Sequence, residues 1–307
     1  YLRLWGITSL TPEQAAALVG SPGQRLEVTG VRDITPEVAR ALVRGKRDEL
    51  GLGITTLSTD IAEILAEFPC DLEFPYLETL SLESAKAIAE HGEAVRLGSE
   101  IVGPTLDLGK ARLTTAIAEA LLAHDGPLSL NRLKRLEHGV GDILAKHRFP
   151  VLLMLEEIDS VPLARKLFSE PNASSSVENL RTMSPAIAAE YARGDPGGLD
   201  SLDTLTVEAA RELAQCKQAI RLYAITKLSP ELATALTERA LGVYLPGLKS
   251  LDGPDAVRVA EALASTPAPV YIEYLERISA PALAALRKKP TIKIPPDEKL
   301  TIVPESL

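Results

Sequence analysis

Cysteine and long apolar runs are scarce in this sequence, and each shortage excludes a class of protein. Cys70 and Cys216 precede strand-like segments that lie six repeats apart in the pattern described below. At about 5 Å per strand they would be about 30 Å apart, too far for a disulfide within one chain. The apolar runs, such as Val151 to Leu155, contain only a few residues, whereas a membrane-spanning helix needs about 20. We therefore expect neither a disulfide-stabilised scaffold nor a transmembrane segment.

Aromatic residues and positive charge are also in short supply. Phe, Trp and Tyr make up 4% of the 307 residues, with a single tryptophan. The 33 Lys and Arg residues stand against 42 Asp and Glu residues, which gives a net charge of −9. Without a tight basic cluster this balance repels nucleic acid and anionic lipid headgroups, so neither is an expected partner. The 46% of hydrophobic residues exclude intrinsic disorder.

Motifs for catalysis, cofactor binding and metal binding are missing from the sequence. No G-x-x-x-x-G-K-[ST] occurs, and the closest Gly-rich segments, Gly139–Gly141 and Gly194–Gly198, fall between a helix and a strand, where glycine is typical of turns. Four histidines lie at or near predicted helix ends, without a C-x-x-C or H-E-x-x-H beside them: His91, His124, His138 and His147. We predict no catalytic residue, no cofactor and no metal site, and therefore a protein that is not an enzyme.

The sequence does contain one pattern repeated many times. Each unit reads Leu-x-Leu-x-x-Ile-x-x-Leu, then Ser or Thr, often Pro-Glu, then an Ala-rich stretch that ends in Leu. The first unit carries it at Leu2, Leu4, Ile7, Leu10 and Leu18. The first strand positions of the twelve units are 2, 26, 50, 72, 95, 128, 153, 175, 197, 220, 243 and 270. The period of roughly 23 residues predicts a repeat architecture.

The pattern of each unit predicts one short strand followed by one helix. The Leu-x-Leu part alternates with period 2, as a strand with one buried face does. In Thr11-Pro12-Glu13 and Ser229-Pro230-Glu231 the hydroxyl can cap a helix, proline suits its first turn, and glutamate faces the positive end of the helix dipole. A unit this short cannot bury its own apolar face, so neighbouring units must stack into a solenoid. Helices are wider than strands, so the predicted solenoid curves with its strands on the concave face.

The unit resembles the leucine-rich repeat, whose usual pattern is L-x-x-L-x-L-x-x-N/C-x-L at 20 to 29 residues. The resemblance covers nearly the whole chain and is closest to divergent bacterial-type repeats, because the Asn ladder is missing. The Asn/Cys position is apolar instead, at Ile7, Val31, Leu77, Leu133, Ile158, Leu180, Leu202, Ile225, Leu248 and Leu275. The resemblance implies an α/β horseshoe with short parallel strands on the concave face and helices on the convex face.

We predict one solenoid over residues 1–307, with about 12 to 13 repeats and two irregular segments. Segment 98–112 either inserts about ten residues or holds a truncated turn followed by a unit at Leu106. Segment 162–176 has a short helix and a polar stretch, consistent with a loop or a mild hinge. Residues 291–307 predict a C-terminal edge strand, with Pro295 and Pro296 ending the array.

The N-terminal end indicates a cut array. The first repeat starts at Leu2 with no capping segment before it, and no basic region with an apolar core precedes it. We therefore expect a fragment or a mature form of a longer protein, with any signal peptide absent or already removed. The sequence indicates neither the compartment nor the oligomeric state.

The most informative surface is the inner face of the predicted sheet, which collects tyrosines toward one end. Four of the seven tyrosines fall in three consecutive units on this face, where strands about 5 Å apart bring rings into contact. The candidate partner-binding residues are Tyr223, Tyr244, Tyr271 and Tyr274, with Arg221 and Glu273 beside them. Tyrosine is also simply a good strand residue, so this cluster has a purely structural alternative.

These observations favour a non-catalytic scaffold that binds a protein or peptide through its concave face. Rigid, amphipathic tyrosine rings supply contact area at low entropic cost and are enriched at interfaces. The alternative is a structural or surface-exposed repeat segment of a longer bacterial protein, such as an adhesin or envelope component. An N-terminus that begins directly in a repeat favours that alternative.

Overall fold

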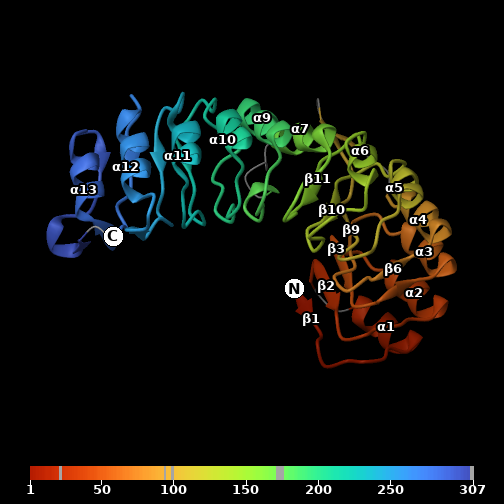
Figure 1. The fold of residues 1–307 in the computed structure, drawn as a ribbon. Coiled ribbons are helices and arrows are strands. Elements are labelled where there is room, and N and C mark those ends of the chain that lie inside the picture. Colours follow the sequence, from red (N-terminus) through yellow and green to blue (C-terminus); the bar gives the residue numbers. More distant parts are fainter. Residues whose placement is uncertain (21–22, 93–94, 98–99, 171–175, 305–307) are drawn as a thin grey trace. The chain divides into compact units, whose positions relative to one another are not determined.

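The computed structural model describes residues 1–20, 23–92, 95–97, 100–170 and 176–304, with only the backbone for 95–97 and 100–102 (Figure 1). The chain has the predicted α/β class, with parallel strands and helices alternating along it. It divides into two compact units, unit 1 at Tyr1–Met154 and unit 2 at Leu155–Leu307. Each unit is described by itself below. Among the described residues, no helix has the length and apolar character to span a membrane.

The described part of unit 1 contains a sheet of seven parallel strands in the order β1-β2-β3-β5-β9-β10-β11. These strands are β1 (Leu2–Arg3), β2 (Arg25–Val28), β3 (Glu49–Leu52), β5 (Asp71–Glu73), β9 (Leu106–Asp107), β10 (Leu128–Leu130) and β11 (Val151–Leu153). Two short strands after the main ones, β4 (Thr56–Leu57) and β6 (Thr79–Leu80), pair separately. Helices cover one face of the main sheet (Figure 1), so the other face is left for side chains that point away from the core.

The helices of unit 1 follow their strands as the repeat predicts. They are α1 (Pro12–Val19), α2 (Pro36–Val43), α3 (Thr59–Ala66), α4 (Leu82–Ala89), α5 (Thr115–Leu121) and α6 (Val140–Leu144). Thr11 and Thr35 cap α1 and α2 through their hydroxyls, and Gln14 completes a capping box on α1. Successive helices pack on one another, because each one alone leaves an apolar face uncovered.

The strands of unit 1 pair in phase, so the first hydrophobic residue of each lies beside that of the next. This register row is Leu2, Leu26, Leu50, Leu72, Leu106, Leu128 and Val151. Two predicted starts are wrong. β11 begins in phase at Val151 rather than 153, and Val95 does not follow Leu72 in the sheet.

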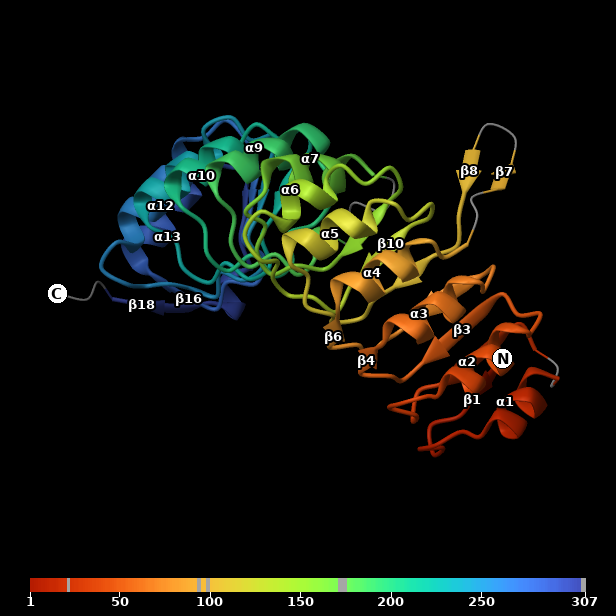
Figure 2. The same cartoon turned by 90° about the vertical axis from the view of Figure 1, so that its right-hand side faces the viewer.

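The irregular segment near residue 98 is resolved by the strand pairing. β5 pairs with β9 at Leu106, where the second alternative starts a unit, but no truncated turn of a repeat precedes it in the described residues. Val95 begins an antiparallel hairpin, β7 (Val95–Leu97) and β8 (Glu100–Val102), inserted before that strand. Figure 2 shows this hairpin standing clear of the sheet of unit 1. The prediction failed at Val95 because the strand-like pattern of a hairpin resembles that of a repeat.

Unit 2 repeats the same strand–helix alternation. Its described helices are α7 (Val161–Ser169), α9 (Pro185–Gly194), α10 (Val207–Leu213), α11 (Pro230–Thr237), α12 (Ala256–Ser265), α13 (Ala280–Arg287) and the 3-10 helix η1 (Asp297–Lys299). One parallel sheet contains β12 (Ile220–Arg221), β13 (Val243–Tyr244), β15 (Val270–Tyr271) and β17 (Ile292–Lys293); another contains β14 (Ser250–Leu251), β16 (Arg277–Ser279) and β18 (Thr301–Val303).

The predicted irregularity at 162–176 is seen only in part. Helix α7 is nine residues long, longer than the eight of α1, so the expected short helix is wrong. Residues 171–175 of the polar stretch lie outside the described part of the chain. At the C-terminal end, β17 and β18 are the last strands of their sheets in the pairing order.

Buried histidines connect successive turns on the helix-to-strand side of unit 1. The rings of His91 and His124 stack at 5.6 Å between centroids, and those of His124 and His147 at 6.3 Å. Nε2 of His91 donates to the carbonyl oxygen of Cys70 at 2.8 Å, and Nε2 of His124 to that of Pro104 at 3.1 Å. Burial lowers the pKa of both histidines to about 4, so they are neutral near pH 7 and tie loop carbonyls together.

Candidate functional site

The strand register of unit 2 places two of the predicted tyrosines side by side. Tyr244 of β13 pairs with Tyr271 of β15, while their neighbours Val243 and Val270 are fully buried. Side chains alternate along a strand, so the tyrosines point to the sheet face that the helices leave open. Arg221 of β12 lies beside Tyr244 in the same row.

Tyr244 and Tyr271 form one rigid aromatic pair. Their rings are parallel within 1°, with centroids 4.1 Å apart. The guanidinium carbon of Arg221 lies 5.3 Å from the centroid of Tyr244 and extends the stack by a cation–π contact. A hydrogen bond with the Tyr271 hydroxyl raises the pKa of Tyr244. The Tyr244 hydroxyl is therefore protonated near neutral pH and available as a hydrogen-bond donor or acceptor.

Tyr223 and Tyr274 stand on the loops that follow β12 and β15, and both are open to solvent. Their exposed fractions are 48% and 57%. Nζ of Lys249 lies 4.9 Å from the ring centroid of Tyr274. Gly247 is required in the loop between them, because a Cβ there would clash with the carbonyl oxygen of Tyr223. The absence of a side chain at Gly247 therefore lets its loop pack closely against the backbone of the Tyr223 loop.

All six predicted partner-binding residues line one hollow of about 180 Å³ in unit 2. The lining residues are Arg221, Tyr223, Tyr244, Pro246, Tyr271, Glu273 and Tyr274. Pro246 is the member that sequence reasoning missed. It could have been found from the register, since it holds the position in its repeat that Tyr223 and Glu273 hold in theirs.

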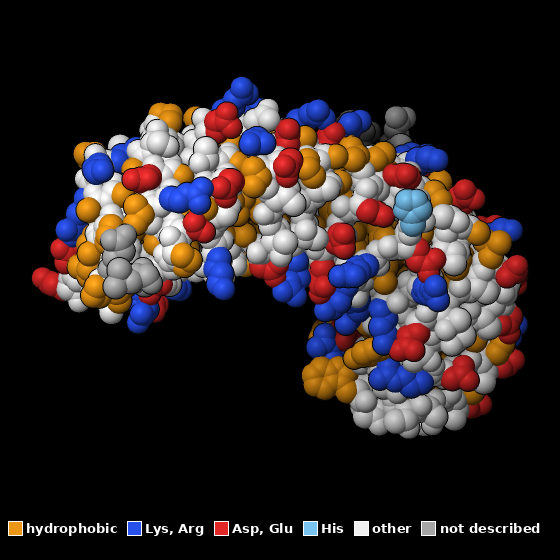
Figure 3. Space-filling model, in the orientation of Figure 1, with side chains coloured by type: hydrophobic (Ala, Val, Ile, Leu, Met, Phe, Trp, Pro, Cys, Tyr) orange, Lys and Arg blue, Asp and Glu red, His pale blue; other side chains and the backbone are white. Residues whose placement is uncertain are grey.

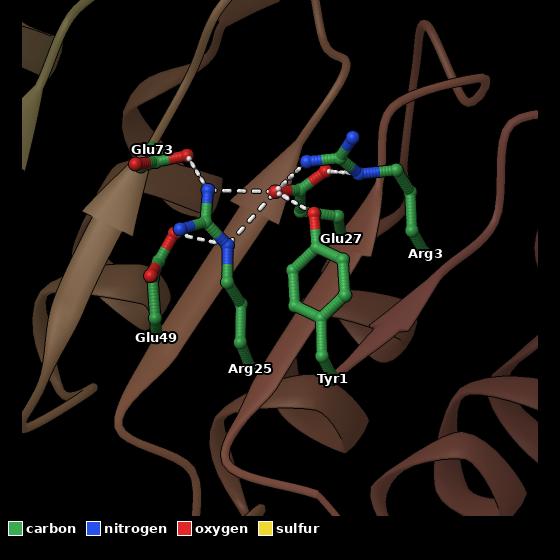
Figure 4. A network of polar contacts seen from close by, with 6 residues as sticks. All are labelled: Tyr1, Arg3, Arg25, Glu27, Glu49 and Glu73. Atoms are coloured by element: carbon green, nitrogen blue, oxygen red, sulfur yellow. Dashed lines mark hydrogen bonds and ion pairs between the residues drawn. The ribbon is translucent and has the colours of Figure 1, made fainter.

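The corresponding face of unit 1 carries a charged network instead of a row of stacked tyrosines (Figure 4). One oxygen of Glu27 accepts hydrogen bonds from the Tyr1 hydroxyl at 2.8 Å, Arg3 Nη2 at 3.0 Å and Arg25 Nε at 2.8 Å. Arg25 also pairs with Glu49 at 2.7 Å and Glu73 at 3.0 Å. Gly51 makes room for this network, because a Cβ there would lie 3.1 Å from Cγ of Glu27.

The sequence-based choice of residues on this sheet face covered the tyrosine repeats of unit 2 and missed Arg25 and Glu49 of the network. Both missed residues come directly before the first strand leucine of their repeats. Residues two apart in a strand share a face, so the position before the leucine lies on the same side as the position after it. This alternation could have placed Arg25 and Glu49 on the face, although not their pairing across strands.

Glu27, Glu49 and Glu73 have the spacing of metal ligands, with one oxygen of each within 4.8 Å of the others. The guanidinium of Arg25 lies among them and pairs with all three carboxylates. Burial, together with the neighbouring Glu73, raises the pKa of Glu49 to about 7. The carboxylates are thus engaged by an arginine at the position where a cation would bind.

The chain matches no known protein family and no curated protein sequence. Its function must therefore be argued from the surfaces that the two units present.

Proposed function

We propose that the strand–helix units are divergent leucine-rich repeats stacked as a solenoid, with the strands on its concave face. Three features support this proposal. The strands of unit 1 pair in phase, the helices begin at hydroxyl caps, and the position of the usual Asn ladder is filled by buried residues such as Val31, Leu77 and Leu248.

We propose that the protein is a non-catalytic scaffold that binds a protein or peptide through the tyrosine surface of unit 2, made of Tyr223, Tyr244, Tyr271 and Tyr274. The observation that carries the proposal is that these four rings, from three neighbouring repeats, line one hollow with Arg221 and Glu273. Large rings with few rotatable bonds lose little entropy on binding. The exposed rings of Tyr223 and Tyr274 would contact the partner, and the stacked rings of Tyr244 and Tyr271 would form the preorganised base of the site.

The polar groups at this surface suit a peptide backbone. Arg221 has no ion pair in the described part of unit 2, so its guanidinium can donate to carbonyl or carboxylate oxygens. The tyrosine hydroxyls and the carboxylate of Glu273 can bind backbone amides. An extended segment lying across the strands would meet an aromatic ring at each of three successive repeats.

The test is a selection from a random peptide library displayed on phage, carried out on the unmodified chain and on a Tyr223→Ser, Tyr274→Ser variant. We expect enriched peptides that bind the unmodified chain and bind the variant at least tenfold more weakly. The control is Leu241→Ser, which removes an equally exposed apolar side chain (62%) elsewhere in unit 2 and should leave binding unchanged. No enrichment, or equal binding to all three proteins, would favour the structural repeat segment instead.

A further inference from the structure

A second hollow lies on the sheet face of unit 1 and is independent of the tyrosine surface. Its volume is about 450 Å³, and its lining combines four arginines, two glutamates and two aromatic rings. Trp5 follows β1 and Tyr76 follows β5, so the rings line the hollow from repeats on either side of β2 and β3. Figure 3 shows Lys and Arg side chains gathered over this part of unit 1.

The carboxylates of this hollow are already satisfied by arginines of the network. Glu27 is 5% exposed and is engaged by Arg3 and Arg25, and Glu73 is engaged by Arg25. The other two lining arginines, Arg32 and Arg132, form no ion pair in the described part of the chain. The hollow therefore offers a ligand two positive charges outside any ion pair in the described residues, although the protein as a whole is acidic.

Tyr76 brings these two arginines together. The guanidinium carbon of Arg32 lies 4.2 Å from the ring centroid of Tyr76, and that of Arg132 lies 5.9 Å from it. Arg32 is further fixed by a hydrogen bond from Nη1 to the carbonyl oxygen of Gly53 at 2.9 Å. Its remaining donors form no hydrogen bond with the residues that the structure describes. A guanidinium presents its donors in one plane, which suits two oxygens of a phosphate or carboxylate.

Trp5 supplies an apolar surface in the same hollow. Its side chain is 68% exposed, although Arg3 contacts the ring at 5.3 Å. Gly30 holds the Trp5 loop close to the next repeat, because a Cβ at Gly30 would clash with the carbonyl oxygens of Trp5 and Ile7. The backbone beneath Trp5 is thus fixed while its ring stays accessible.

We infer that this hollow binds an oxyanion, a phosphate or a carboxylate, carried on an aromatic group. Arg32 and Arg132 bind the oxygens, and Trp5 and Tyr76 contact the planar part of the ligand. Arg32 and Arg132 repel a ligand that presents a cation, because their positive charges lie outside any ion pair in the described part of the chain.

Trp5 is the single tryptophan of the chain, so its fluorescence reports directly on the hollow. The chain is titrated at constant ionic strength with phenyl phosphate, benzoate, inorganic phosphate and benzylamine. We expect a saturable change with phenyl phosphate or benzoate, a weaker response to inorganic phosphate, and none to benzylamine. The tighter of the two aromatic anions identifies the oxyanion as phosphate or carboxylate. Absence of saturable binding of either anion, or tighter binding of benzylamine, would overturn the inference.

Substitutions separate site binding from a general charge effect. Arg132→Gln and Arg32→Gln should each weaken binding of the preferred anion at least tenfold. Arg44→Gln removes the same charge from an exposed arginine just after α2 and should leave binding unchanged. Both site arginines are exposed, so the variants should retain the melting temperature of the unmodified chain. Equal binding by all three variants would refute the assignment of Arg32 and Arg132.

Discussion

The same position of the repeat carries opposite chemistry in the two units. Next to the first strand hydrophobic residue, unit 1 has Arg3, Glu27, Gly51 and Glu73 in register, whereas unit 2 has Arg221, Tyr244, Tyr271 and Lys293. In unit 1 charged side chains satisfy one another across strands, while in unit 2 rings stack and leave further rings exposed. Because both sets lie on the sheet face away from the helices, the fold tolerates both, and this face is free to be specialised for binding.

The units also differ in how they should respond to acid, and this is the largest effect we expect. All four histidines of the sequence lie in unit 1. Burial lowers the pKa of His91 and His124 to about 4, so the unfolded chain binds more protons than the folded one between about pH 6.5 and pH 4. The two neutral histidines therefore contribute fully to stability above pH 6.5. As the pH falls toward 4, the free energy of unfolding decreases by about 3 kcal/mol for each histidine.

Hydrogen exchange, expressed as protection factors at pH 7.5 and pH 4.5, tests this difference. Peptides from α4 and α5 should lose protection at pH 4.5 more than peptides from α11 and α12. Glu49 acts in the opposite direction, since its raised pKa of about 7 favours the folded state at low pH. A His91→Gln, His124→Gln variant isolates the histidine contribution. Equal loss of protection in both units, or no change in the variant, would contradict the prediction.

Removing the central carboxylate of the charged network should have the next largest effect. Glu27→Gln leaves Tyr1, Arg3 and Arg25 without their shared charged acceptor. Glu27 is buried, but the two arginines are about one third exposed, so solvent screens part of the loss. We expect the free energy of unfolding to decrease by about 2 kcal/mol, a value between those for surface and buried ion pairs. Thermal unfolding measures it, with Glu37→Gln as the control because its ion pair with Arg40 is exposed.

The sequence predicts the repeated part of the fold well because each repeat caps its helix and buries its apolar face in the same way. Hydroxyl caps such as Thr11 and Thr35, and leucines such as Leu26 and Leu50, are explained by the residues of one unit and its neighbour. Val95 was misassigned because a hairpin and a repeat strand share the same alternation, and only the pairing of β5 with β9 distinguishes them.

The tyrosine surface was predictable for the same reason, whereas the charged network was not. A row of tyrosines needs only the register of successive repeats. The network depends on long side chains that contact residues of other strands, as Arg25 contacts Glu73 two strands away. The periodicity of a strand does not indicate which of these contacts form. The histidine stack was also missed, because a histidine near a helix end gives no indication of its burial.

The aromatic pair of unit 2 should contribute less to stability than the network of unit 1. Tyr271→Leu keeps a large apolar side chain in the row but removes the stacked ring at 4.1 Å. We expect a melting temperature about 3 °C lower, from the loss of one aromatic pair in a unit of this size. Tyr271→Phe keeps the stack and should show almost no change. If the melting temperature fell further in the phenylalanine variant than in the leucine variant, the hydroxyl rather than the ring stacking would stabilise the pair.

The smallest effect on stability should accompany the largest effect on binding. Tyr223 and Tyr274 are about half exposed, so replacing each with serine removes little buried area, and the melting temperature should change by less than about 1 °C. Peptide binding should nevertheless fall at least tenfold, because these rings are the ones free to contact a partner. A residue kept only as a good strand former would show the reverse, a loss of stability without a loss of binding. The two measurements on one variant therefore distinguish a binding surface from a structural one.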